Sequence, residues 1–473
     1  MAPASPFTTG LLTLTLLFTG GCTVVGPDYQ PPDQTALAPQ WQAPLPTGSS
    51  KLSLQEWWKG FADEGLSALV EATLSQNFNL EAMQGAIEAA RAVLVVQQGA
   101  ELPQATLAGK IGRSGNTPNP TVPTVTSKSM IVDAAWELDL FGRVKLATES
   151  AEAKVAAREA DLQALRISLT AEVARLYSDL RGCQQLVTLL QSDVASRQKT
   201  AEIVQKSVAA GFIAAGEGSL SQASYADARS QLTAQQATCE LTIKNLVALS
   251  GLAEPEVRNL LGQGGNKWPQ ATAFTLTTLP AQLLSQRADL VSAEQELMAA
   301  NAEIGVAEAN RYPRLSLLGN VTIGVISQGS KVTDNQPWSF GPALSLPILD
   351  GGVLAANVKG AKARHRIALA NYRQAVQNAV KEVESALVNL VSSQTRRQDA
   401  HLAAREYANY FQASEENWRK GGISLLSLEE TRRLTLNAQK AVVQLEMQQV
   451  QSWINLYKAL GGGWQQGEGT DPS

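Results

Sequence analysis

The chain has 473 residues, of which 44% are hydrophobic, 17% charged and 5% aromatic. These proportions exclude a disordered tail and a membrane protein built from several spanning helices. The composition is also uniform along the chain, which favours one repeated architecture over three separate domains of about 150 residues. The formal net charge of −4 lacks the basic excess of a nucleic-acid-binding protein, so polyanionic partners are not expected.

The N-terminus predicts export. An apolar run at residues 11–18 is followed by small residues and then by Cys22. The run is too short to span a bilayer permanently and is typical of a signal peptide. The pattern resembles a bacterial lipoprotein signal, in which Cys22 becomes the first mature residue and carries diacylglycerol and an N-acyl lipid. Thr23, in place of the Asp that retains lipoproteins at the inner membrane, favours the outer membrane. An ordinary signal peptide with an unmodified cysteine is the alternative, because Thr19 stands where a branched apolar residue is usual.

The rest of the chain is a tandem duplication. Each half has the order helix, extended segment, extended segment, long helix, helix. We therefore expect a signal peptide at 1–21, an N-terminal lipid-anchored extended segment at 22–60, a first repeat at 61–262, a second repeat at 263–464 and a C-terminal tail at 465–473. Six pairs of identical residues are separated by 210 positions: Leu74 and Leu284, Leu80 and Leu290, Ala90 and Ala300, Pro103 and Pro313, Leu107 and Leu317, and Gly109 and Gly319.

Polar and apolar residues alternate in the extended segments. In residues 130–138 the even positions are apolar, while the odd positions include Asp133 and Glu137. One face therefore suits lipid and the other suits water. Each run of about 10 residues is long enough for a tilted transmembrane strand, although a soluble sandwich explains the alternation equally well. Four strands cannot close a barrel alone and lipid does not tolerate an open edge, so a membrane location requires oligomerisation.

Long helices are expected after the extended segments. Residues 144–210 contain no proline, and apolar residues recur there every seven positions, as they do in the second half. Such heptads predict coiled-coil-like packing, and a helix of some 65 residues is a rod about 100 Å long. Charged residues interrupt it throughout, so it must run through water. A cytoskeletal or adaptor coiled coil would explain the heptads but not the pairs of alternating extended segments or the signal peptide.

Several motifs in order resemble the outer membrane efflux proteins, the TolC-like factors of the lipoprotein branch. They lie at residues 22–29, 57–58, 287–290, 312–313 and 457–464. The resemblance implies an α+β membrane protein that forms a homotrimer. In such a trimer each protomer gives four transmembrane strands to one 12-stranded outer-membrane barrel, which continues as a long periplasmic α-helical barrel.

The resemblance also implies a function. Family members are the outer-membrane exit channel of a tripartite efflux pump in Gram-negative cells, and they passively conduct drugs or other small molecules. An inner-membrane pump, commonly of the resistance-nodulation-division class, joins the channel through a periplasmic adaptor (membrane fusion) protein. No catalytic residue, cofactor or metal is expected. His365 and His401 are the only histidines, which leaves little material for a histidine triad or metal site. A periplasmic coiled-coil adaptor and an envelope hydrolase are the alternatives.

The turns between helices, at residues 211–221 and 420–427, are expected to form the periplasmic mouth. By the resemblance, the constricting apolar residue of the gate falls on Leu426 and an entrance acid on Glu430. Two alternatives stay open: Leu426 packs in the ordinary apolar seam between helices, and Glu430 is a solvent-exposed acid on a helix. The tips expected to contact the adaptor or the pump are Gly211, Gly421, Gly422 and Ser424.

The remaining cysteines are expected to form a disulfide. Cys183 lies 28 residues before Gly211, and Cys239 lies 21 residues after Gly218. Antiparallel helices that turn between those glycines carry both thiols to similar heights, with a mismatch of about 7 residues, or roughly 10 Å. The periplasm is oxidising, and paired thiols there commonly become disulfides. Two buried free thiols are the alternative.

Overall fold

The computed structural model describes residues 24–32, 40–45, 54–115, 124–263, 268 and 287–464. Cys22 and the signal peptide lie outside these residues. The chain divides into two compact units, and each unit draws on both sequence repeats. The repeats at 61–262 and 263–464 therefore describe the order of elements and not compact units. The first unit contains Met1–Pro32, Gly85–Glu159 and Ser292–Arg373, and the second contains Asp33–Gln84, Ala160–Val291 and Gln374–Ser473.

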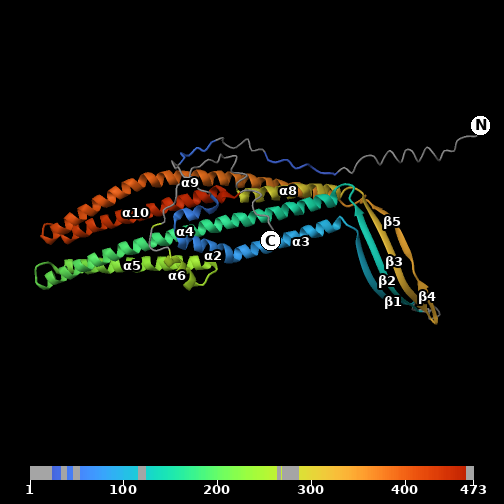
Figure 1. Cartoon of the computed structure of the whole chain (residues 1–473), viewed down its shortest axis with the longest axis horizontal. Helices are drawn as coiled ribbons and strands as arrows, with labels where there is room; N and C mark the ends of the chain where they lie inside the picture. Colours follow the sequence, from blue (N-terminus) through green and yellow to red (C-terminus); the bar gives the residue numbers. More distant parts are fainter. Residues whose placement is uncertain are drawn as a thin grey trace, which may run out of the picture. The chain divides into compact units, whose positions relative to one another are not determined.

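The order of elements repeats along the chain as predicted (Figure 1). The first half contains α2 (Glu64–Gln76), α3 (Phe78–Ala100), β1 (Gln104–Ser114), β2 (Val125–Leu138), α4 (Arg143–Ala209), α5 (Ala215–Ser250) and α6 (Glu254–Gln263). The second half contains α8 (Ala288–Ala309), β3 (Arg314–Gln328), β4 (Lys331–Asn335), β5 (Trp338–Ser345), α9 (Val353–Arg419) and α10 (Leu425–Ala459). The two long helices, α4 and α9, have 67 residues each.

The strands of the first unit form one antiparallel sheet (Figure 1). β1 pairs with β2, and β2 pairs with β3. β3 then pairs with β5 along its first half and with β4 along its second half. β4 and β5 thus form one row that is interrupted near Pro337, which has no N–H to donate to a neighbouring strand. The four predicted strands are confirmed as four rows, the last of them broken.

Both long helices begin at an acidic cap. The carboxylate of Asp139 accepts hydrogen bonds from the backbone N–H groups of Val144 and Lys145, at 2.9 and 2.8 Å. Asp350 accepts in the same way from two backbone N–H groups at the start of α9. These bonds satisfy N–H groups that have no partner inside the helix. Among the helices of the described residues, none is long and apolar enough to cross a membrane.

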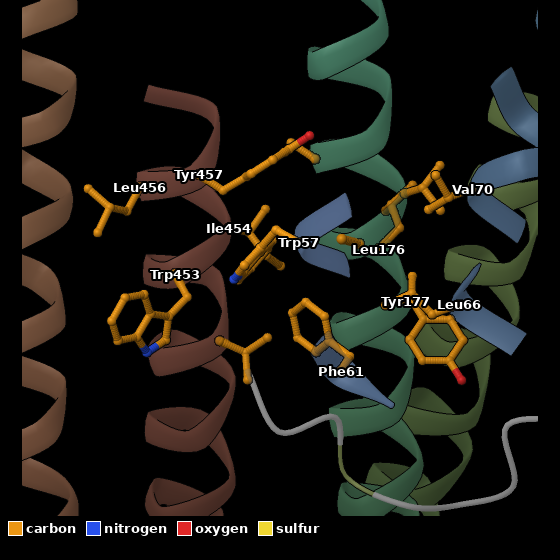
Figure 2. Close-up of a cluster of buried hydrophobic side chains, with 14 of the residues drawn as sticks. Trp57, Phe61, Leu66, Val70, Leu176, Tyr177, Trp453, Ile454, Leu456 and Tyr457 are labelled. Carbon is orange, nitrogen blue, oxygen red and sulfur yellow. The ribbon is translucent and has the colours of Figure 1, made fainter. Parts of the chain in front are cut away.

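An aromatic cluster forms the core of the second unit (Figure 2). Trp57 lies in a short 3-10 helix, η1 (Leu54–Phe61), and its side chain is 1% exposed. Its ring stacks on Tyr457 of α10 with 5.2 Å between ring centroids and meets Phe61 edge-on at 4.8 Å. Leu176 and Tyr177 of α4 belong to the same buried cluster. The motif at residues 57–58 and the motif at residues 457–464 therefore pack together. The second motif ends α10 and continues into the three glycines of η2 (Gly461–Gly463).

Candidate channel sites in the sheet and at the helical turns

One face of the sheet is apolar. Residues paired between strands share a face, as do alternate residues along one strand. A row that crosses all four strands contains the exposed side chains of Leu107, Val132, Val321 and Trp338. Along β2 the apolar positions run from Met130 to Leu138, about 26 Å at 3.3 Å per residue. This is close to the height of the apolar band on a transmembrane sheet, about 25 Å.

The opposite face of the sheet is polar. The neighbouring row contains Thr106, Asp133, Asn320 and Ser339. The alternation predicted for residues 130–138 is confirmed at Asp133 and Glu137, which pair with Asn320 and Ser316 of β3. Ile131 and Ala135 lie on the same face. Ser316 and Thr322 of β3 follow Asn320 onto the polar face.

Aromatic residues gather where the strands meet the helices. The ring of Phe141, just after β2, stacks on Tyr312, just before β3, with 4.7 Å between centroids. The indole N–H of Trp136 donates to the backbone carbonyl of Glu101 at 2.9 Å. Amphipathic rings at one end of an apolar band are typical of the interface between a bilayer and water.

The segment that follows Cys22 is held at this same junction. The N–H of Val25 donates to the carbonyl of Phe141 at 3.1 Å, and the side-chain amide of Asn301 donates to the carbonyl of Pro27 at 2.9 Å. The Tyr29 hydroxyl donates to Glu294 at 3.2 Å. Burial and the nearby Glu294 carboxylate raise the pKa of Tyr29, so its hydroxyl stays a donor. These contacts fix the chain from Val25, three residues after Cys22, beside the end of β2.

The two helical turns have the same backbone. Gly211 and Gly421 each have φ +77°, a left-handed conformation that side chains disfavour and that commonly ends helices. In both turns the following N–H reaches back five residues to a carbonyl, from Phe212 to Ser207 and from Gly422 to Asn417, each at 2.9 Å. Both helical hairpins therefore close with the same hydrogen-bonded turn.

The first turn is shorter than predicted. It ends where α5 begins at Ala215, so the expected range of 211–221 was wrong at its far end. Gly218 lies inside α5 and does not break it. A Cβ at this glycine would lie 3.3 Å from the side chains of Gln205 and Val208 on α4. Gly218 thus lets the two helices approach each other. In sequence, a glycine with this packing role cannot be told from one that marks a turn.

The predicted disulfide is present in the structure. Cys183 of α4 and Cys239 of α5 are bonded, with Cα atoms 5.6 Å apart. The shorter turn also removes the predicted mismatch in height, since it lies nearly midway between the two cysteines in sequence. The bridge therefore joins the two helices of the first hairpin well away from its turn.

The predicted gate residues have different surroundings. Leu426 is 67% exposed, whereas its neighbours Leu425 and Leu428 are buried against Val204 of α4. Leu426 therefore takes no part in the apolar seam within the chain. Glu430 is exposed and pairs with Arg433 at 2.6 Å. The hydrogen bond to that guanidinium holds the pKa of Glu430 below its usual range, so the carboxylate keeps its charge at neutral pH.

The sequence did not reveal a buried charge network close to these turns. Arg197 of α4 binds Asp193 at 2.8 Å and Glu429 of α10 at 2.9 Å. Glu429 also pairs with Arg432 and accepts a hydrogen bond from Ser224 of α5 at 2.6 Å. The network therefore joins three helices and both hairpins. The residues on α4 and α5 lie more than 200 positions from Glu429 in sequence. Only the local spacing of each charge pair on its own helix is visible in sequence.

The two histidines lie apart on α9. His401 is about half exposed, and its Nε2 lies 3.4 Å from the carboxylate of Glu446. His365 is partly buried. The described residues contain no group of three or more side chains placed to hold a metal ion.

Comparison with known proteins identifies the architecture. The sequence pattern of the family described as outer membrane efflux protein matches residues 69–252 and again residues 279–462. The chain belongs to the outer membrane efflux protein family. The second match begins and ends 210 positions after the first, which is the spacing of the duplication found in the sequence. The predicted family is therefore confirmed.

Individual family members match over nearly the whole chain. Nodulation protein T of Rhizobium leguminosarum bv. trifolii is 30% identical over 460 residues, with 96% of each chain covered. The solvent efflux pump outer membrane protein SrpC of Pseudomonas putida is 30% identical over 475 residues, covering 95% of this chain and 97% of its own. The outer-membrane channel OprN superposes with a TM-score of 0.78 at 31% identity, covering 93% of this chain and 99% of its own. The chain is an outer-membrane exit channel of an efflux system.

Proposed function

We propose that three copies of this chain close into one channel through the outer membrane of a Gram-negative cell. The observation that supports this most directly is the four-row sheet, which has one apolar face and ends in β1 on one side and in the β4/β5 row on the other. Lipid does not tolerate unpaired strand edges. The β4/β5 edge of one copy therefore needs the β1 edge of the next. Three copies supply 12 rows, enough for a closed transmembrane barrel.

The polar face of the sheet then lines the lumen, and α4, α5, α9 and α10 form the periplasmic part. The chain passively conducts drugs or other small molecules that an inner-membrane pump delivers through a periplasmic adaptor, and it performs no reaction. The pump is proposed to be of the resistance-nodulation-division class. Relatives are named for nodulation, solvent efflux and pyoverdine export. That variety supports a channel whose cargo is chosen by its pump.

The helical turns are proposed as the periplasmic mouth. Gly211, Gly421, Gly422 and Ser424 are the tips that contact the adaptor or the pump. Leu426 is proposed to constrict the closed entrance and Glu430 to give it negative charge. The exposure of both side chains within the chain supports this role, because residues that close a symmetric opening must stay free of packing inside their own protomer.

A lipid on Cys22 is proposed as a second anchor. The contacts of Val25, Pro27 and Tyr29 hold the start of the mature chain at the aromatic end of the sheet, within reach of a bilayer surface. We expect Cys22→Ser to abolish labelling by a radioactive fatty acid and to leave trimers in the outer membrane, since the sheet buries far more apolar area than one lipid anchor. Labelling that persists in Cys22→Ser would refute the assignment.

Extraction and conductance together test the channel itself. We expect the protein to leave the membrane only with detergent, to have the mass of three copies, and to form ion-conducting pores in planar bilayers. A monomer released without detergent would contradict the proposal and would favour a periplasmic adaptor instead.

A further inference from the structure

A hollow opens on the sheet near the middle of β1, beside large residues of the apolar face. It measures about 460 Å³ and is lined by Gly109, Ile111, Lys128, Met130 and Ile323 of one face and by Lys110 and Ser129, which pair with each other on the opposite face. Gly109 pairs with Met130, and that residue pairs with Ile323, so these three residues form one row. A Cβ at Gly109 would meet nothing within 4 Å. The absent side chain thus leaves a gap between large apolar neighbours.

Two basic residues lie on the apolar face on the side of the hollow away from the helices, and one of them, Lys128, lines it. Lys128 pairs with Ile111 and Val325, so it shares their face of the sheet. Arg113 lies on the same face one row further out, paired with Thr126. Diagonal neighbours of this kind have Cα atoms about 7–8 Å apart. Both side chains are exposed.

The same row also contains an acid. Asp334 of β4 pairs with Val325, which places it two strands from Lys128 on the same face. The charged groups on this part of the face are therefore two cations close together on β1 and β2 and one acid on the far side of β3. The positive charge gathers beside the hollow.

The position of these groups matters because they face lipid. Along β2 the apolar positions end at Met130, and the next residue on that face is Lys128. A cation at the limit of an apolar band lies at the level of lipid headgroups, where it attracts anionic groups. By the proposed function, on which this inference rests, the strand turns are at the cell exterior, where the outer leaflet displays phosphorylated glycolipid.

We propose that this hollow binds lipid A, with a phosphate against Lys128 and Arg113 and an acyl chain in the gap over Gly109. The cation pair supplies charge complementarity for a phosphate. The apolar row beneath it supplies a surface for hydrocarbon. An amphiphile with both parts fits the site better than a soluble phosphate, which would leave the apolar hollow unfilled.

Lipid A titration of the detergent-purified full chain tests the site, with native mass spectrometry as the readout. We expect Lys128→Gln with Arg113→Gln to weaken binding about 30-fold, from the usual contribution of two basic residues near an anionic lipid surface. Gly109→Leu, which fills the gap, is expected to weaken binding with both charges intact. Lys331→Gln is the matched control, because Lys331 pairs with Gln328 and lies on the polar face.

The ligand is varied in the same assay. We expect lipid A without its phosphates, and phosphatidylglycerol, to bind more weakly than intact lipid A. Equal binding of phosphatidylglycerol would overturn the choice of lipid A, and equal binding of the double variant and wild type would overturn the site. The number of copies and the conductance are measured on each variant. If these are unchanged while lipid A binding is lost, the site is supported; if wild type forms no trimer, the proposed function fails separately.

Discussion

The two helical hairpins have the same backbone geometry, but only the first is cross-linked by a disulfide. α4 and α9 have the same length, and their turns contain glycines with the same φ of +77°. The first hairpin carries the disulfide between Cys183 and Cys239. At the corresponding positions, 210 residues later, the second hairpin has Ser393 and Gln449. The duplication thus kept the geometry of the hairpin while only one copy kept or gained a covalent bridge.

The same contrast holds near the turns. Leu426 and Glu430 of the second hairpin correspond to Gly216 and Leu220 of the first. The residues proposed for the gate are therefore confined to the hairpin without the bridge. The charge network around Glu429 connects that hairpin to α4, so the bridged hairpin supports the one that carries the proposed gate.

The largest effect is expected from breaking the charge network. Arg432 is 4% exposed and pairs with Glu429, whereas the adjacent Arg433 is 60% exposed and pairs with Glu430. Breaking a buried ion pair costs up to about 3–5 kcal/mol when it leaves a charge without a partner. Removing Arg432 takes away one of the two cations that bind Glu429 and leaves Arg197 as the other, so we expect a loss below that upper range. We expect Arg432→Ala to lower the unfolding temperature strongly and Arg433→Ala to leave it nearly unchanged. Equal shifts in thermal unfolding of the two variants would show that the network adds nothing to the hairpins.

Removing the disulfide is expected to have the next effect. In the chain-entropy account a loop of this size stabilises the folded state by up to about 4 kcal/mol, and measured gains are often smaller. We expect Cys183→Ser with Cys239→Ser to lower the unfolding temperature more than Ser393→Ala with Gln449→Ala in the second hairpin. Mass spectrometry of the unreduced protein checks the bridge itself: alkylation of both cysteines in denaturant without reductant would rule it out.

The gate proposal predicts a change in conduction without a large loss of stability. Leu426→Ser replaces an exposed apolar side chain that we propose excludes water from the closed mouth. We expect higher single-channel conductance, and we expect Glu430→Gln to reduce the preference for cations. Leu220→Ser in the first hairpin is the control and should change neither property. Unchanged conductance and selectivity in planar bilayers would remove Leu426 and Glu430 from the gate.

The sequence predicted best those features that are determined by residues close together in the chain. Alternation in residues 130–138 predicted the faces of β2 because the period of a strand is fixed by its own backbone. The disulfide was also predictable, since an antiparallel hairpin converts sequence distance from the turn into height. The end of the first turn was predicted too late in the sequence, because a glycine such as Gly218 commonly interrupts helices. In the structure Gly218 lies inside α5 and allows close packing with α4.

The charge network was not predictable in the same way. Arg197 and Glu429 meet only because α4 and α10 align in the folded chain, and neither residue carries a signal of burial in its own helix. The assignments of Leu426 and Glu430 came from a family resemblance, and the structure adds that both side chains are exposed.

The smallest expected effect concerns the first residue after each turn. Ser424 accepts a hydrogen bond from the N–H of Ser427 at 3.2 Å, whereas Ala214 at the same place before α5 has no side chain that can cap. Ser424→Ala should destabilise the second hairpin by about 1 kcal/mol. Ala214→Ser should stabilise the first hairpin by part of that amount, because it adds a cap where none exists. Because the disulfide already holds α5 to α4, we expect the local effect to be clearer in α10. Hydrogen exchange at the first turn of each helix measures it: protection at Ser427 should fall in Ser424→Ala, and equal protection in both proteins would mean that packing of Leu425 and Leu428, and not the cap, fixes the start of α10.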